Sequence, residues 1–148
     1  MTQKYRLTTL GWYNFERLVQ SLLKAAIGAG VASFGGSTDQ GRDATFEGYA
    51  NFPSENTRWS GYWVFQVKFI DYEEFPSNEA QSRLKSELCN EMKKIIQKKR
   101  RKPDNYILLT NISVTSSNRD KLSKIALDCG FIGNYATIDG EEICQLLD

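Results

Sequence analysis

The chain opens on a hydrophobic pattern with helical spacing. Apolar residues recur every three or four positions between residues 12 and 27, and Gly28 and Gly30 follow directly. This spacing gathers the apolar side chains on one stripe, and the glycines end the pattern. We therefore predict an amphipathic helix over 12–27. Its apolar positions are Trp12, Phe15, Leu18, Val19, Leu22, Leu23, Ala26 and Ile27.

Three strands are predicted after this helix. A short one lies within 30–36, and another begins at Asp43, where Ala44 and Phe46 alternate with polar residues. A loop follows, and the segment 62–69 alternates again. We expect the second and third strands to pair in antiparallel fashion. In the third strand one face carries Trp63, Phe65, Val67 and Phe69, and the other carries Tyr62, Val64, Gln66 and Lys68.

The second half of the chain alternates helices and strands. A helix is predicted after Pro76, capped by Ser77 or Asn78 and continuing through a basic run until Pro103. Its apolar stripe is Leu84, Leu88, Met92, Ile95 and Ile96. The apolar run 105–110 is typical of a central strand that is covered on both faces.

Another helix is predicted to begin with a capping box of Ser117 and Asp120 and to end at Gly130. A strand at 135–138 and a short helix from Gly140 complete the chain. Strand–helix–strand units favour parallel pairing. The pattern therefore predicts an α/β protein, with a mixed sheet between two layers of helices. We expect one domain over 1–148, and the abrupt last helix suggests the N-terminal part of a longer protein.

The composition excludes several kinds of catalytic and metal site, although it says little about the fold. The net charge is +1, and the sequence contains no histidine. Mechanisms that use histidine as a general base or a zinc ligand are therefore excluded. The three cysteines are far apart in sequence without CxxC spacing, which argues against a disulfide framework or a zinc site. No apolar run reaches the roughly 18 residues that a membrane span needs, and we expect a cytoplasmic protein with reduced thiols.

Four residues could converge on one chemical site. Gln66 and Lys68 share one face of a strand, and Asp43 opens the strand before it. Glu16 borders the apolar stripe of the first helix. The carboxylates of Asp43 and Glu16, the amide oxygen of Gln66 and the carbonyl of Val67 are the hard oxygen ligands that Mg²⁺ prefers. Lys68 could then orient or deprotonate a water molecule that attacks a phosphate.

These residues resemble those of a known superfamily. Glu16 in "FERLVQSLL", the segment "DQGRDATFEG" and the strand "FQVK" resemble the PD-(D/E)xK nucleases, specifically the Mrr-like restriction endonuclease branch with a QxK motif. The resemblance implies a restriction-endonuclease-like αβββαβ core with a further helix and strand. It also implies that Asp43 binds the metal and that Gln66 and Lys68 form the variant motif. The glutamine removes one negative ligand from the usual set.

The resemblance further implies a function and partners. We expect a Mg²⁺-dependent endonuclease, with Mn²⁺ as a substitute, that cuts double-stranded DNA and serves bacterial anti-phage defence or restriction. The segment "NYILLTNISVT" is similar to such domains fused to NTPase modules, so a C-terminal NTPase or sensor region and an active homo-oligomer are expected. Two alternatives stay open: an inactive module that binds nucleic acid or protein, and a nuclease that cuts RNA.

A basic run follows the second long helix pattern. One interpretation is a solvated helix end that complements the helix dipole. The other is contact with nucleic-acid phosphates, which would make binding depend on salt. The run consists of Lys98, Lys99, Arg100, Arg101 and Lys102.

Overall fold

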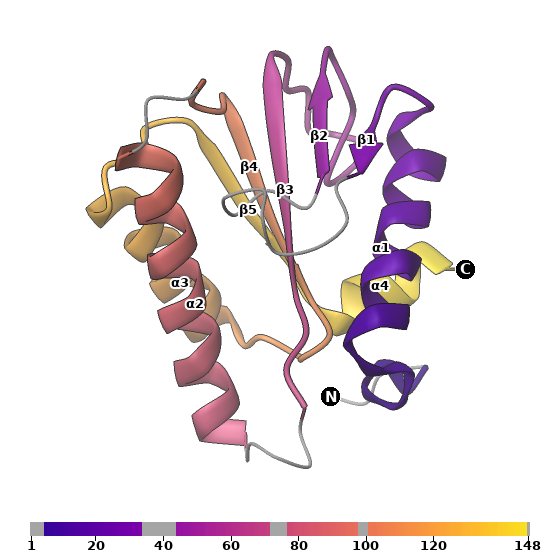
Figure 1. The fold of residues 1–148 in the computed structure, drawn as a ribbon, viewed down its shortest axis with the longest axis vertical. Coiled ribbons are helices and arrows are strands. Elements are labelled where there is room, and N and C mark those ends of the chain that lie inside the picture. Colours follow the sequence, from indigo (N-terminus) through magenta and orange to yellow (C-terminus); the bar gives the residue numbers. More distant parts are fainter. Residues whose placement is uncertain (1–4, 34–43, 72–76, 98–100, 148) are drawn as a thin grey trace.

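A five-stranded sheet lies at the centre of the computed structural model, which describes residues 5–33, 44–71, 77–97 and 101–147 (Figure 1). The strands lie in chain order: β1 pairs with β2 and β2 with β3 in antiparallel fashion, whereas β3–β4 and β4–β5 are parallel. The predicted mixed sheet is confirmed. The strands are β1 (Ala32–Ser33), β2 (Ala44–Glu47), β3 (Tyr62–Lys68), β4 (Asn105–Thr110) and β5 (Asn134–Ile138).

Helices cover both faces of this sheet. On one face lie α1 and α4, and on the other lie α2 and α3, so the molecule has three layers (Figure 1). The predicted order of helices and strands is confirmed, with one short 3-10 turn, η1, that the pattern did not predict. The helical elements are η1 (Leu7–Leu10), α1 (Gly11–Ile27), α2 (Ser77–Gln97), α3 (Ser116–Asp128) and α4 (Gly140–Leu147).

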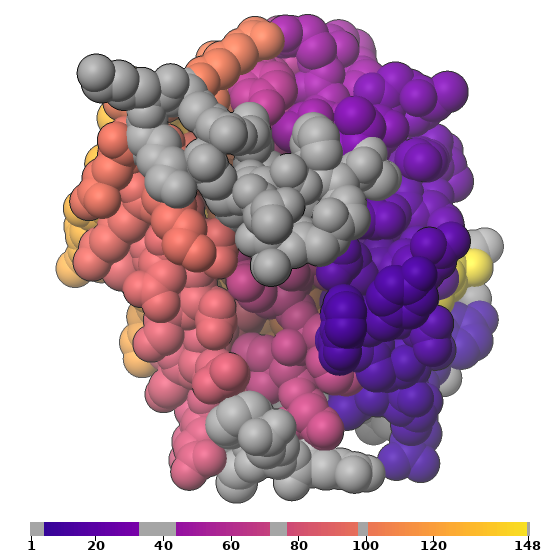
Figure 2. Space-filling model, in the orientation of Figure 1, coloured from indigo at the N-terminus to yellow at the C-terminus, as the bar shows by residue number. Residues whose placement is uncertain are grey.

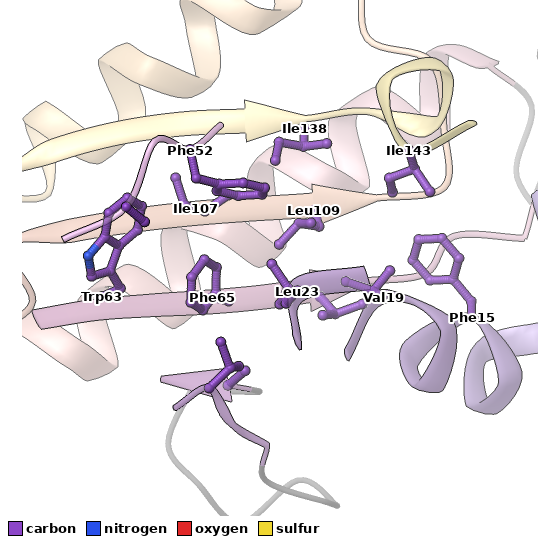
Figure 3. Close-up of a cluster of buried hydrophobic side chains, with 14 of the residues drawn as sticks. Phe15, Val19, Leu23, Phe52, Trp63, Phe65, Ile107, Leu109, Ile138 and Ile143 are labelled. Atoms are coloured by element: carbon purple, nitrogen blue, oxygen red, sulfur yellow. The ribbon is translucent and has the colours of Figure 1, made fainter. Parts of the chain in front are cut away.

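The core on the α1 side is built from the apolar stripe of α1. Phe15, Val19 and Leu23 are buried and point toward the sheet, where Phe65 of β3 and Leu109 of β4 meet them (Figure 3). Burying large side chains of this kind contributes about 1.5–3 kcal/mol each. The stripe therefore fixes α1 over β3, with the half-exposed Glu16 beside buried Phe15.

The other core joins the opposite face of the sheet to α2 and α3. Val64 of β3 and Tyr106 of β4 pack with Leu84 and Leu88 of α2 and with Leu122 of α3, and all five are fully buried. The two faces of β3 therefore belong to different cores, as its alternation predicts. Gln66 and Lys68 accordingly lie on the face that α2 covers.

Two local predictions about helix faces and caps are wrong. Trp12 was expected in the buried stripe, but it lies in the first turn of α1 and is 64% exposed. The cap of α3 is Thr115 rather than Ser117, because the Thr115 side chain accepts a hydrogen bond from the backbone N–H of Asn118. In both cases the helix was predicted correctly, but the residue at which its first turn begins was not.

The end of α2 also differs from the prediction. Among the described residues the helix ends at Gln97, and Arg101 and Lys102 are outside any helix. The Arg101 guanidinium pairs with both carboxylate oxygens of Glu47 and lies over the ring of Tyr62, 4.5 Å from its centroid. These contacts hold the segment against β2 and β3, which is incompatible with continuing the helix to Pro103.

A buried asparagine joins the ends of β3 and β4. Asn111 Oδ1 accepts a hydrogen bond from the Ile70 N–H at 2.8 Å, and its Nδ2 donates to the Ile70 carbonyl at 2.7 Å and to the Thr8 hydroxyl at 3.1 Å. The side chain is fully buried. It therefore fixes the backbone that follows Lys68 and connects it to η1.

None of the described helices combines the length and the apolar character that crossing a membrane requires.

Candidate functional site

Lys68 is the charged centre of the site that the sequence predicted. It lies at the end of β3, and its side chain is 24% exposed. Its Nζ is 3.3 Å from Glu87 Oε2 and 3.5 Å from Glu91 Oε1, both on α2. Atoms at the end of β3 reach the surface between α1 and α2 in the space-filling view (Figure 2). Lys68 is therefore a half-buried cation that is held by two carboxylates and is partly open to solvent.

Glu91 is buried more deeply than an ordinary helix-surface acid. Its side chain is 11% exposed, and Oε1 also accepts a hydrogen bond from Lys94 at 3.4 Å. Its Oε2 is buried and has no hydrogen-bond partner within the described ranges. A buried carboxylate is stable only when its charge is compensated, and here two lysines provide that compensation.

Gln66 is placed by a tyrosine from the neighbouring strand. The hydroxyl of Tyr106 donates to Gln66 Oε1, and both residues are fully buried. The Nε2 of Gln66 has no hydrogen-bond partner among residues 5–33, 44–71, 77–97 and 101–147. The amide oxygen is thus already engaged by a hydroxyl group, and one lone pair remains for any further ligand.

Glu16 is linked to this site by charge, although its helix covers the other face of the sheet. The pKa of Glu16 is raised above its ordinary value of 4.5, chiefly because burial disfavours the carboxylate; the positive charge of Lys68 acts in the opposite direction. Glu16 and Lys68 are 52 positions apart in sequence (68 minus 16). The fold therefore brings the predicted helix carboxylate into electrostatic range of the predicted lysine.

Of the remaining predicted residues, several lie outside the described part of the chain. These are Asp43, Lys98, Lys99 and Arg100. Val67 lies between Gln66 and Lys68, and its side chain is buried on the α1 face. Arg101 is engaged by Glu47 and Tyr62, and Lys102 is exposed.

No family model, curated protein or solved structure matches the chain.

The two α2 carboxylates that hold Lys68 were not predicted from the sequence. Glu91 stands between Leu88 and Met92 in the buried stripe of α2, and Glu87 is one turn earlier. An acid inside an apolar helical stripe is the signal that could have identified Glu91, because it must meet a cation to be buried. That Lys68 of β3 is the cation it meets is visible only in the structure.

Hard oxygen donors dominate the site, which suits a divalent cation such as Mg²⁺. Within the described ranges, however, no three acidic or cysteine side chains gather closely enough to hold a metal ion. Glu16 supplies one carboxylate. A complete ligand set of the predicted kind also requires Asp43, which is outside the described residues.

The raised pKa of Glu16 predicts that its ionisation opposes folding. A carboxyl whose pKa is higher in the folded state binds protons more readily there than in the unfolded chain. Stability from this group therefore falls as the pH rises from 4.5 through the folded-state pKa. We expect Glu16→Gln to increase Tm slightly at pH 7, by more than at pH 4, when thermal unfolding is followed by circular dichroism.

Glu55→Gln is the matched control, because Glu55 is an exposed loop carboxylate. Its Tm difference from the wild type should not grow between pH 4 and pH 7 in the way expected for Glu16. A Glu16→Gln protein that is less stable than the wild type at pH 7 would show that the carboxylate stabilises the fold, which contradicts this prediction.

Proposed function

We propose that this chain is a metal-dependent endonuclease domain that hydrolyses phosphodiester bonds in DNA. One observation carries the proposal: the positive charge of Lys68 acts on the pKa of Glu16, although the two residues were selected from distant parts of the sequence. An ionisable group that burial destabilises beside a specific charged partner is a feature of functional sites more often than of ordinary surfaces.

The arrangement of elements supports a restriction-endonuclease-like fold. Helix α1 precedes three strands that pair in antiparallel fashion, and α2 then leads to β4, which is parallel to β3. This is the αβββαβ order that the resemblance implies, with α3, β5 and α4 added. The QxK motif lies at the end of the central strand β3.

Mg²⁺, or Mn²⁺ as a substitute, is the proposed cofactor. Glu16 and Asp43 would hold it with their carboxylates, and Gln66 and the Val67 carbonyl would add neutral oxygens. When bound, the metal would polarise the phosphate and favour a nucleophilic hydroxide. The single lone pair that remains on Gln66 Oε1 limits that residue to one further contact.

Charged side chains of the protein would position the phosphate and the attacking water and would hold or transfer protons. Lys68 is half-buried, so its charge is less screened than that of a surface lysine, and it would orient the phosphate or the attacking water. Glu87 and Glu91 would hold the ammonium group in place, since each lies within 3.5 Å of it. Glu16, whose pKa is raised, could hold a proton closer to neutral pH than an exposed glutamate could.

The proposal also covers the substrate and the cellular role of the domain. Double-stranded DNA is the proposed substrate, and the run Lys98 to Lys102 would contact its phosphates. Arg101 would have to exchange its pairing with Glu47 for such a contact. We further propose that the domain acts in the cytoplasm as an effector in anti-phage defence or restriction, as a homo-oligomer under the control of an NTPase or sensor region.

The test is cleavage of supercoiled plasmid by the purified protein with Mg²⁺ or Mn²⁺. We expect nicked and linear products from the wild type and none after addition of EDTA. Asp43→Asn should lower the rate by at least about 10²-fold, because it removes a charged metal ligand and keeps the side-chain shape. A parallel assay on RNA of the same length distinguishes the two nuclease substrates.

One observation favours an inactive binding module as the second candidate. The oxygen of Gln66 and the charge of Lys68 already have partners within the protein. Under this alternative, no preparation cleaves DNA with either metal, whereas retardation of labelled DNA in a gel persists. Asp43→Asn would then bind DNA as the wild type does.

A further inference from the structure

Two cysteines that are distant in sequence have their sulfur atoms in contact. Cys89 is in the middle of α2, and Cys129 is the residue that ends α3. Their Sγ atoms are 3.6 Å apart, close enough for a thiol hydrogen bond. Both thiols are free in the structure and both are partly exposed. This contact depends on the packing of α2 against α3, which the sequence spacing could not reveal.

The backbone around both sulfur atoms is well fixed. Cys129 N–H donates to the Ile125 carbonyl at 3.0 Å, and the following N–H groups of Gly130 and Phe131 return to carbonyls of the last turn of α3. Cys129 also packs at the rim of the core between α2, α3 and the sheet. Because Cys89 lies within α2 and Cys129 is the C-cap residue of α3, the packing of these two helices keeps the pair together.

We propose that Cys89 and Cys129 form a reversible disulfide bond when the protein meets a low-molecular-weight disulfide oxidant. A disulfide requires an S–S distance of about 2.05 Å, so the two sulfur atoms must approach by roughly 1.5 Å. Small rotations about χ1 in two neighbouring side chains supply a movement of this size. The proposal is independent of nuclease activity.

The reaction consists of two thiol–disulfide exchanges. Cys89 loses its proton to solvent, and its thiolate attacks one sulfur of the oxidant; a mixed disulfide forms and one small thiolate leaves. Cys129 then loses its proton and attacks Cys89 Sγ, which forms the internal bond and releases the second small thiolate. Both small thiolates take up protons. The two cysteines are oxidised by two electrons in total, and the oxidant is reduced to two thiols.

The order of these steps follows from the surroundings of Cys129. Burial and the hydrogen bond with Cys89 raise the pKa of the Cys129 thiol; nearby Asp128 acts in the same direction and Lys93 in the opposite one. The raised pKa disfavours the Cys129 thiolate, and Cys129 therefore suits the second step, in which the mixed disulfide lies beside it.

Cys144 offers an internal reference. It is 2% exposed, and its Sγ donates a hydrogen bond to the Tyr5 carbonyl at 3.6 Å. A buried thiol of this kind is inaccessible to a small oxidant while the protein is folded. The three thiols should thus separate into one reacting pair and one that does not react.

The experiment treats the dilute, folded protein with oxidised glutathione at pH 8 and counts thiols after denaturation. We expect the count to fall from three to one, with the mass of two hydrogen atoms lost and with no dimer on a non-reducing gel. Peptide mapping should show Cys89 joined to Cys129, and dithiothreitol should restore all three thiols. The bond closes a long loop, so Tm should rise by about 10 °C.

Three serine variants complete the test. Cys144→Ser should still lose two thiols, whereas Cys89→Ser and Cys129→Ser should each fail to form an internal bond. A glutathione adduct on Cys89 in the Cys129→Ser protein would support the proposed order. The proposal is overturned if the wild type keeps three thiols while folded, or if the mapped bond is intermolecular or includes Cys144.

Discussion

Replacing Lys68 with methionine is expected to lower the rate of Mg²⁺-dependent plasmid cleavage by on the order of 10²- to 10³-fold. Removal of one positioned group that stabilises transition-state charge has an effect of this size. Methionine keeps most of the aliphatic stem, so packing at the end of β3 changes little. The measurement is the initial rate of loss of supercoiled plasmid under single-turnover conditions, beside a binding assay on the same DNA.

Lys124→Met is the matched control for this prediction. Lys124 is exposed on α3 and is not among the ion-pair partners of Glu87 or Glu91 in the described residues, and its replacement also removes one positive charge. Its cleavage rate should stay within about a factor of two of the wild type, because isolated surface charges contribute little. Equal losses in the two variants would mean that general attraction to DNA, rather than a placed ammonium group, explains the role of Lys68.

A second variant separates catalysis from folding. In Lys68→Met, Lys94 is the one cation still paired with Glu91 among the described residues, so the buried carboxylate is destabilised. Adding Glu91→Leu removes that carboxylate and replaces the ion pair by apolar groups, a change that is often neutral or stabilising. We expect the double variant to recover the Tm of the wild type without recovering cleavage. Recovery of cleavage together with stability would assign Lys68 a structural role only.

Periodicity was sufficient to predict most of the fold. Successive residues of β3 pack into the two cores in turn, as predicted, and the largely apolar β4 is buried along its whole length. These predictions succeed because burial of an apolar stripe or face dominates the free energy of each element. Two details depend on a single helical turn: the cap at Thr115 and the exposure of Trp12. Each is decided by a local contribution to the free energy, such as one hydrogen bond, that the hydrophobic pattern does not reveal.

The candidate site was predictable only in part, because its contacts join residues of distant elements. Alternation placed Gln66 and Lys68 on one face, and resemblance selected Glu16. Neither could reveal that Glu91 reaches Lys68, or that the Tyr106 hydroxyl meets Gln66. Such pairs depend on the register between β3 and β4 and on the rotation of α2 about its axis. Both are set by the packing of the whole core.

The end of β3 should depend strongly on the hydrogen bonds of Asn111. Asn111→Ala removes two hydrogen bonds to Ile70 and one to Thr8, and it leaves the buried polar groups of Ile70 without those partners. At about 1 kcal/mol for each bond, we expect a loss of about 3 kcal/mol in the free energy of unfolding. Tm should fall by about 10 °C in a thermal melt, as expected for a chain of this length.

Asn111→Ala should increase local opening near Ile70 more than it increases unfolding of the whole domain. Ile70 is two residues beyond Lys68, so loss of the asparagine should increase hydrogen exchange at the Ile70 amide more than at amides in the middle of β4. Asn90→Ala is the control, since Asn90 is exposed on α2 and its loss should change stability by less than about 0.5 kcal/mol. If the Ile70 amide stays protected in Asn111→Ala, the side chain does not fix this backbone. If it exchanges faster, the backbone next to Lys68 is held by the hydrogen bonds of Asn111 as well as by the ion pairs of Lys68 with Glu87 and Glu91.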